Sequence, residues 1–176
     1  MRGNWRAMAL FGAIMLQLLV LAGELLGAVY PRWLGEEVRL AVQPVDPRSL
    51  FRGNYAQLRY AIGEVQLAEL PRTLRRGESV YVPLRRDAAD LMQADGLLLE
   101  PPDGRPFIRG RVETDYSTAR GVTVRIRYGI EAYFLPREKA LALEKALRNS
   151  GSVATVMVAP NGKAALMEVD PGVNTD

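Results

Sequence analysis

The sequence predicts a mainly β domain, an antiparallel sandwich or a partly open barrel, preceded by one N-terminal transmembrane helix. Three features indicate this: a long apolar run near the N-terminus, period-two alternation from residue 37 onward, and one later stretch with helical spacing. A chain of 176 residues has room for one domain and an anchor. We expect a short basic leader (1–6), a transmembrane signal-anchor (7–30), an exported β-rich domain (36–170) and a flexible tail (171–176).

The apolar run over residues 7–29 predicts the membrane span, because its only strongly polar side chains are Gln17 and Glu24. A helix of this length is roughly 34 Å long, enough to cross a hydrocarbon core of about 30 Å. Trp5 and Tyr30 flank the run, where aromatic residues mark membrane interfaces. Gln17 is central and is our candidate for a helix–helix contact. Glu24 lies nearer the end, where we expect its carboxylate to extend toward the headgroups.

The flanking charges orient this span weakly, because Arg2 and Arg6 precede it and Arg32 follows it. A short basic leader before a long apolar run is typical of an uncleaved signal-anchor, which exports the C-terminal domain. A cleaved signal peptide is the alternative, since residues 20–22 offer small side chains at suitable offsets. The apolar run continues to Val29, beyond that position, and so favours the anchor.

Alternating apolar side chains predict the strands that follow. The positions are Val38, Leu40 and Val42; Ala56, Leu58, Tyr60 and Ile62; Val65 and Leu67; Val80, Val82 and Leu84; Ile108 and Val112; Val122, Val124, Ile126 and Tyr128. In the second set, Tyr55 faces opposite to Leu58 and Tyr60, so we expect only one tyrosine to pack inward with the leucine. Residues 97–100 predict a further short strand, and residues 87–93 predict one helical turn.

Two elements in the C-terminal half have their own signals. Pro136 suits a first helical position, and an apolar stripe continues from it to Leu147, so we expect a helix covering an edge or open end of the sheet. Asn161-Gly162 stands between two β-prone runs, 153–159 and 163–169. This dipeptide predicts a hairpin with a type I′ turn.

Composition excludes most common enzyme chemistries. The chain has no cysteine and no histidine, which removes disulfides, thiol nucleophiles, Ser-His-Asp triads and histidine-ligated metals. The net charge of +3 comes from dispersed basic residues, so we expect no binding to nucleic acid. We expect no cofactor and no metal, and we do not expect an enzyme.

Two segments are too distinctive for ordinary strands and turns. Residues 46–60 read Asp-Pro-Arg-Ser-Leu-Phe-Arg-Gly-Asn-Tyr-Ala-Gln-Leu-Arg-Tyr, and residues 127–136 read Arg-Tyr-Gly-Ile-Glu-Ala-Tyr-Phe-Leu-Pro. Together they resemble the GDYXXLXY family, whose signature is Gly-Asp-Tyr, two residues, Leu, one residue and Tyr. The matching residues are Gly53, Tyr55, Leu58 and Tyr60. Asn54 departs from the signature, because it stands in the place of the aspartate.

This resemblance implies a membrane-associated bacterial protein whose biochemical activity is not established. Members are often encoded beside multi-spanning membrane proteins, which implies a membrane complex. Together with the N-terminal pattern, it leads us to expect a single-pass protein of the inner membrane, anchored in the bilayer through residues 7–30, with its domain in the periplasm or otherwise extracytoplasmic. Our first hypothesis is therefore a non-enzymatic accessory subunit whose partner is a multi-spanning membrane protein.

The two segments supply our candidate site, as a binding or a structural motif. Its residues are Asp46, Arg48, Arg52, Gly53, Asn54, Tyr55, Leu58, Tyr60, Gly129, Glu131 and Tyr133. The polar members are either a cluster that binds a partner or ligand, or a loop network that fixes strand register, which we favour. A second hypothesis is a module that binds an envelope molecule through Arg48, Arg52 and Tyr55. A third is an atypical hydrolase centred on Glu131, with a second carboxylate from Asp46, Glu113 or Asp115.

Overall fold

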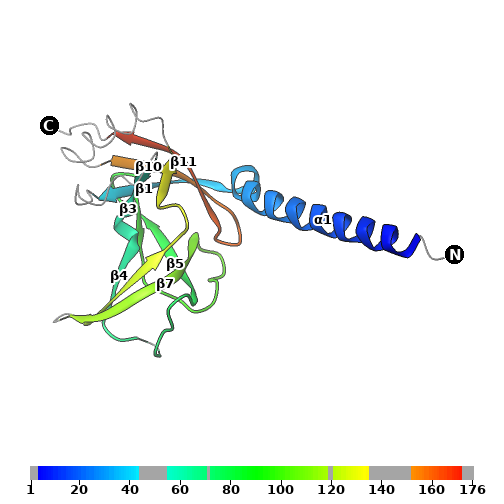
Figure 1. The fold of residues 1–176 in the computed structure, drawn as a ribbon. Helices are drawn as coiled ribbons and strands as arrows, with labels where there is room; N and C mark the ends of the chain where they lie inside the picture. Colours follow the sequence, from blue (N-terminus) through cyan, green and yellow to red (C-terminus); the bar gives the residue numbers. More distant parts are fainter. Residues whose placement is uncertain (1–3, 44–54, 71, 119–120, 135–151, 172–176) are drawn as a thin grey trace.

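The protein is an open β half-barrel with a long helix projecting from it (Figure 1). The computed structural model describes residues 4–43, 55–70, 72–118, 121–134 and 152–171. Within these ranges the one α-helix is N-terminal, α1 (Asn4–Leu34). The mainly β fold class and the N-terminal apolar helix are thus as predicted. The second helix that we expected, over residues 136–147, lies outside the described residues.

Helix α1 stands clear of the β domain over most of its length. Every residue from Asn4 to Leu26 is exposed, a stretch of roughly 35 Å. The mean hydropathy of its most apolar window is 2.1, so the helix is long and apolar enough to cross a membrane. Burial against the domain begins at Gly27 and is complete at Pro31 in the last turn.

The strands form one nine-stranded sheet in the order β11-β10-β1-β6-β5-β7-β8-β4, with β3 paired to β1. Their bounds are β1 Glu36–Gln43, β3 Arg59–Tyr60, β4 Glu64–Leu67, β5 Ser79–Arg86, β6 Met92–Ala94, β7 Phe107–Thr118, β8 Gly121–Arg127, β10 Ser152–Val158 and β11 Ala164–Pro171. A separate two-stranded ribbon pairs β2 (Tyr55–Gln57) with β9 (Ala132–Phe134). A 3₁₀ turn, η1 (Ala61–Gly63), links β3 to β4. Among the described strands only β1 and β6 pair in parallel, through Leu40 and Met92.

The core is one cluster of buried apolar side chains, and the period-two alternation places its members on one face of their strands. Side chains at alternate positions are buried on β1, β5 and β8, as the sequence predicts. Seven core residues are 0% exposed: Leu40, Val80, Val82, Ile108, Val124, Ala154 and Val156. Burial of apolar surface of this kind is the main favourable term in folding.

The β10–β11 hairpin is confirmed, but its turn is not type I′. A type I′ turn needs positive φ at both central residues, and among described non-glycine residues only Asp90 has positive φ. Instead, Gly162 donates its N–H to the Ala159 carbonyl at 2.8 Å, and Gly162 has φ +77°. Pro160 fixes the second turn position at negative φ, which sets a type I geometry and moves the left-handed residue to Gly162.

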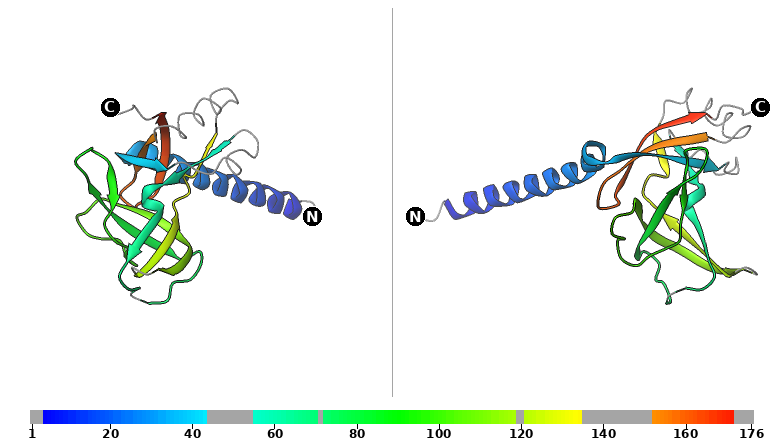
Figure 2. Two further views of the ribbon diagram at one scale, coloured as in Figure 1. Left: turned by 90° about the vertical axis from the view of Figure 1, so that its left-hand side faces the viewer. Right: turned by 180° about the vertical axis from the view of Figure 1, so that it is seen from behind.

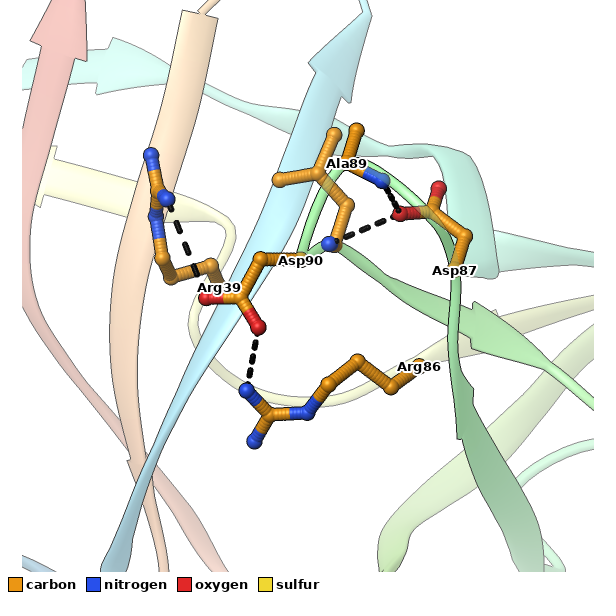
Figure 3. A network of polar contacts seen from close by, with 6 residues as sticks. Arg39, Arg86, Asp87, Ala89 and Asp90 are labelled. Atoms are coloured by element: carbon orange, nitrogen blue, oxygen red, sulfur yellow. Dashed lines mark hydrogen bonds and ion pairs between the residues drawn. The ribbon is translucent and has the colours of Figure 1, made fainter.

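The connection between β5 and β6 is a tight turn rather than the helical turn we expected (Figure 3). Asp87 Oδ1 accepts the N–H groups of Ala89 at 2.8 Å and Leu91 at 2.9 Å. Asp90, at φ 63°, reaches across to Arg86 and to Arg39 on β1. The network therefore joins the turn to the strand next to it.

The expected strand over residues 97–100 is also absent. Leu98 forms only an isolated antiparallel bridge to Tyr81 on β5. Gly96 has φ +101°, and Pro101 follows Glu100, so the extended stretch is too short for a ladder.

Candidate functional site

The two signature segments meet in space, which the sequence could not show. Strand β2 pairs with β9, and Tyr55 lies opposite Phe134 in the register. The contact continues past the ribbon, because Leu58 donates its N–H to the Glu131 carbonyl at 2.7 Å. The Leu-x-Tyr half of the signature therefore lies directly against the Gly-Ile-Glu step.

Two buried tyrosines tie the segments together reciprocally. Tyr60 donates its hydroxyl to the Ile130 carbonyl at 2.8 Å, and Tyr128 donates its hydroxyl to the Ile62 carbonyl at 2.6 Å. Burial raises the pKa of both phenols well above the ordinary value, and the charge of Glu131 raises it further. Both side chains are therefore neutral hydrogen-bond donors under ordinary conditions.

Glu131 closes the turn that carries the second segment. Its Oε1 accepts the N–H of Tyr128 at 2.5 Å, and its Oε2 accepts the N–H of Gly129 at 2.9 Å. Gly129 has φ +85°, a conformation that favours glycine. This turn therefore explains the Tyr-Gly-Ile-Glu spacing. Both carboxylate oxygens of Glu131 accept hydrogen bonds within it.

A groove of about 480 Å³ lies over these contacts, between β3, η1 and β4 on one side and β8 and β9 on the other. Four of the candidate residues line it, Leu58 and Tyr60 from the signature and Gly129 and Glu131 from the second segment. The other lining residues are Gln57, Arg59, Gly63, Glu64, Glu113, Arg125, Ile126, Arg127, Tyr128 and Ala132. We call this space the signature groove.

The charges of the signature groove are mostly paired. Arg125 donates to Glu64 at 2.7 Å, and Arg127 donates to Glu113 at 2.6 Å. Glu113 is the extra residue of a bulge in β7, between Val112 and Thr114, and bulges re-aim side chains in this way. Among the described residues, Arg59 is the one lining side chain whose charge has no partner.

The family comparison now identifies the chain. The model of the family described as "GDYXXLXY protein" matches residues 17–169. The chain belongs to the GDYXXLXY family. No curated protein and no solved structure matches the chain. The family match begins within α1 and runs through the β domain, so the apolar helix and the domain belong to one GDYXXLXY unit.

The GDYXXLXY signature is only partly described by the structure. Tyr60 and Leu58 are both 2% exposed, which confirms that one signature tyrosine packs inward with the leucine. Tyr133 packs, partly buried, against the core. Five of the candidate residues, Asp46, Arg48, Arg52, Gly53 and Asn54, lie outside the described residues, and Tyr55 is described by its backbone alone.

Sequence reasoning missed several groove residues. Arg125 and Arg127 could have been found, because they alternate with the buried Val124 and Ile126 on β8. Glu113, one of the carboxylates that we expect folding to bring near Glu131, does line the same groove, but the bulge that places it has no sequence signal. Asp115, considered with it, does not line the groove.

The described part of this GDYXXLXY chain contains no group of three or more acidic side chains that could hold a metal ion. Among the described residues that line the groove there is no serine, threonine or lysine to act as a nucleophile or a base. What it offers is hydrogen bonding and charge, from Arg59 and Gln57 beside two ion pairs. That arrangement suits recognition of a polar surface.

Helix α1 carries the remaining candidate, Gln17. Gln17 and Glu24 are seven residues apart, and such positions differ by only about 20° around a helix. Both strongly polar side chains of the apolar run over residues 7–29 therefore lie on one face. Gly23 also has open space around it, but it lies about 100° from Glu24 around the helix and so outside this face.

Proposed function

We propose that this GDYXXLXY protein is a non-enzymatic accessory subunit of a bacterial membrane complex. In this proposal α1 docks beside a multi-spanning protein of the inner membrane, and the β domain lies on the periplasmic side. One observation carries the proposal: α1 projects fully exposed from Asn4 to Leu26 with Gln17 and Glu24 on one face. A polar side chain in hydrocarbon is costly unless a neighbouring helix provides its partner.

The contacts of the second motif segment support a non-enzymatic role. Glu131 uses both carboxylate oxygens to hold the backbone of its own turn. Tyr60 and Tyr128 use their hydroxyls to hold carbonyls of the opposite segment. The groups that a carboxylate-dependent hydrolase would require are therefore engaged in structure.

The junction between helix and domain also supports docking through the helix. Only Gly35 separates α1 from β1, and Lys163 donates its Nζ to the Gly27 carbonyl from the hairpin. A partner that holds α1 would thereby fix the position of the β domain above the membrane. The signature groove would then face a periplasmic part of the same complex.

A crosslinking experiment in native membranes tests this proposal. A photoreactive amino acid replaces Gln17 in one variant and Leu19 in another, because positions two residues apart point to nearly opposite faces of a helix. We expect an adduct with one multi-spanning protein at position 17 and little at position 19. Gln17→Leu should release that protein during purification in mild detergent. Equal adducts at both positions, or none at either, would contradict docking through this face.

The signature groove favours a second candidate, a module that binds an envelope molecule. Arg59 is exposed in the groove without a partner among the described residues, and Gln57 lies close by in sequence. We expect wild-type protein to co-purify with a small anionic molecule that Arg59→Gln loses, as measured by mass spectrometry. Arg76→Gln, at an exposed site outside the groove, is the control and should retain it. Identical small-molecule profiles for wild type and Arg59→Gln would remove this candidate.

A further inference from the structure

A second hollow, of about 260 Å³, lies where the hairpin meets β7. Four cationic side chains line it: Arg109, Arg111, Arg127 and Lys163. No carboxylate is among the lining residues in the described part of the chain, and Ser79 adds a hydroxyl. We call it the basic hollow.

The basic hollow lies where the neighbour of β7 changes from strand β8 to the tip of the β10–β11 hairpin. Strand β8 ends at Arg127, and the chain turns away through Gly129. Arg109 of β7 instead donates its N–H to the Gly162 carbonyl at 2.8 Å, so the hairpin tip takes over this edge. Gly162 packs so closely on the Phe107 ring that an added Cβ would lie 2.5 Å from it. The hollow is therefore held open by a firmly docked hairpin.

The cations of the basic hollow are poorly compensated. Arg111 and Arg127 are register partners on adjacent strands, and like charges in that position destabilise a sheet. Glu113 neutralises Arg127 at 2.6 Å. Arg111 has only a contact of 3.4 Å with the Gly77 carbonyl, and the Arg109 guanidinium has no partner in the described part of the chain. A bound anion would offset this repulsion.

The position of the basic hollow indicates where that anion comes from. Lys163 contacts the backbone of α1 at Gly27, the first residue of the helix that is shielded by the domain. The exposed segment before it is long enough to fill the hydrocarbon layer, so Gly27 falls at the level of the headgroups. Figures 1 and 2 show the β10–β11 hairpin on the side of the domain nearest α1.

We propose that the basic hollow binds the phosphate of an anionic phospholipid headgroup in the leaflet from which α1 emerges. Arginine is the side chain best suited to this, because its planar guanidinium holds a phosphate through two hydrogen bonds. Clustered cations beside a membrane span also attract anionic lipids. The inference depends on α1 crossing the bilayer, as the proposed function does, but it needs no protein partner.

Native mass spectrometry of the purified full-length protein tests the proposal. The protein in neutral detergent is titrated with phosphatidylglycerol and, separately, with phosphatidylcholine. We expect a clear preference for phosphatidylglycerol, and Arg109→Gln or Arg111→Gln should weaken its binding roughly fivefold, the loss that one surface cation causes. Arg109→Lys should retain most of the binding. Two glutamine variants are used so that a folding defect in one does not decide the result.

The matched control is Arg32→Gln, which removes the same charge from the exposed end of α1 but outside the hollow. It should leave the preference unchanged. An equal loss in Arg32→Gln would mean that diffuse surface charge attracts the lipid, and would overturn the site. Displacement of the lipid by millimolar inorganic phosphate would assign the hollow to a soluble anion instead. Equal binding of phosphatidylcholine would overturn the proposal altogether. Because no partner is present, these outcomes are independent of the crosslinking result.

Discussion

At the scale of single residues, the signature groove is held by side chains that satisfy backbone groups. Tyr60 and Tyr128 donate to carbonyls, and Glu131 accepts from two N–H groups. A buried backbone group without a partner is costly, so each of these contacts matters more than its own strength suggests. Tyr60→Phe should lower the free energy of unfolding by about 1–3 kcal/mol, because it leaves the Ile130 carbonyl unpaired.

The same two tyrosines predict alkaline unfolding. The pKa of each phenol is higher in the folded chain than in the unfolded chain, where it is 10.0. Such a group stabilises the fold fully at pH values below its unfolded pKa, and this stabilisation is lost as the pH rises from the unfolded toward the folded pKa. We expect the protein to unfold cooperatively above about pH 10. Absorbance at 295 nm, followed together with circular dichroism, should show that Tyr60 and Tyr128 ionise only as the β signal is lost. Smooth ionisation of all seven tyrosines before unfolding would contradict the buried donors.

Gly110 provides a further residue-scale prediction. A Cβ at this position would lie 2.3 Å from Ile126 Cγ2 and 2.9 Å from the Tyr128 ring. Gly110→Ala should therefore displace Tyr128 and destabilise the domain by about 1–3 kcal/mol, the usual result of overpacking. Gly63→Ala is the control, because its Cβ would meet only the Ile126 carbonyl at 3.8 Å. Urea denaturation of both variants measures the difference.

At the scale of elements, the turn between β5 and β6 lies beside the parallel pairing of β1 with β6. Substitutions in this turn can show whether its backbone conformation or its ion pairs stabilise that arrangement. Asp90 combines a left-handed φ of 63° with ion pairs to Arg86 and Arg39. These side chains are about half exposed, so the pairs themselves contribute little. Asp90→Ala should cost about 1 kcal/mol, since alanine strains at positive φ. Asp90→Gly should cost less, and thermal melting compares the two. A larger loss in Asp90→Gly would show that the charges dominate.

How far the sequence predicts an element depends on whether a local pattern determines it. Strands β1, β5 and β8 followed from alternation, because one face of each is buried and a one-residue shift would expose it. The hairpin turn type did not follow from Asn161-Gly162, because Pro160 one residue earlier sets a different geometry. The bulge at Glu113 and the junction where β8 gives way to the hairpin depend on partners distant in the sequence. Alternation cannot reveal either, so the ion pairs of the groove and the basic hollow emerged only from the fold.

The signature itself shows the same limit at the level of the site. The sequence leaves open whether Gly129 and Glu131 bind a ligand or hold a loop, and it favours the loop. The turn that they form explains both residue types without a ligand. What the sequence could not supply was the pairing of β2 with β9, which brings residues about 70 positions apart into hydrogen-bond contact.

At the scale of the whole molecule, the helix and the half-barrel are joined by very little chain but by close contacts. Gly35 is the single residue between α1 and β1, and its N–H bonds the Pro31 carbonyl at 3.0 Å. A Cβ at Gly35 would lie 2.2 Å from that carbonyl oxygen and 3.0 Å from the Val158 nitrogen. The tight junction means that rotation of α1 within a complex would be transmitted to the domain, including both the signature groove and the basic hollow.

Gly35→Ala should break this coupling while leaving each part folded, because the added methyl group would clash only with atoms at the junction, the Pro31 carbonyl oxygen and the Val158 backbone. The chain has no cysteine, so spin labels can be placed at Leu19→Cys and Arg85→Cys without removing native thiols. We expect a narrow distance distribution between the labels in the wild-type background and a clearly broader one with Gly35→Ala, while circular dichroism of the domain is retained. A broad distribution already in the wild-type background would mean that the helix moves independently of the half-barrel. A partner that binds the face of α1 with Gln17 could then hold the domain at the membrane but could not fix its orientation.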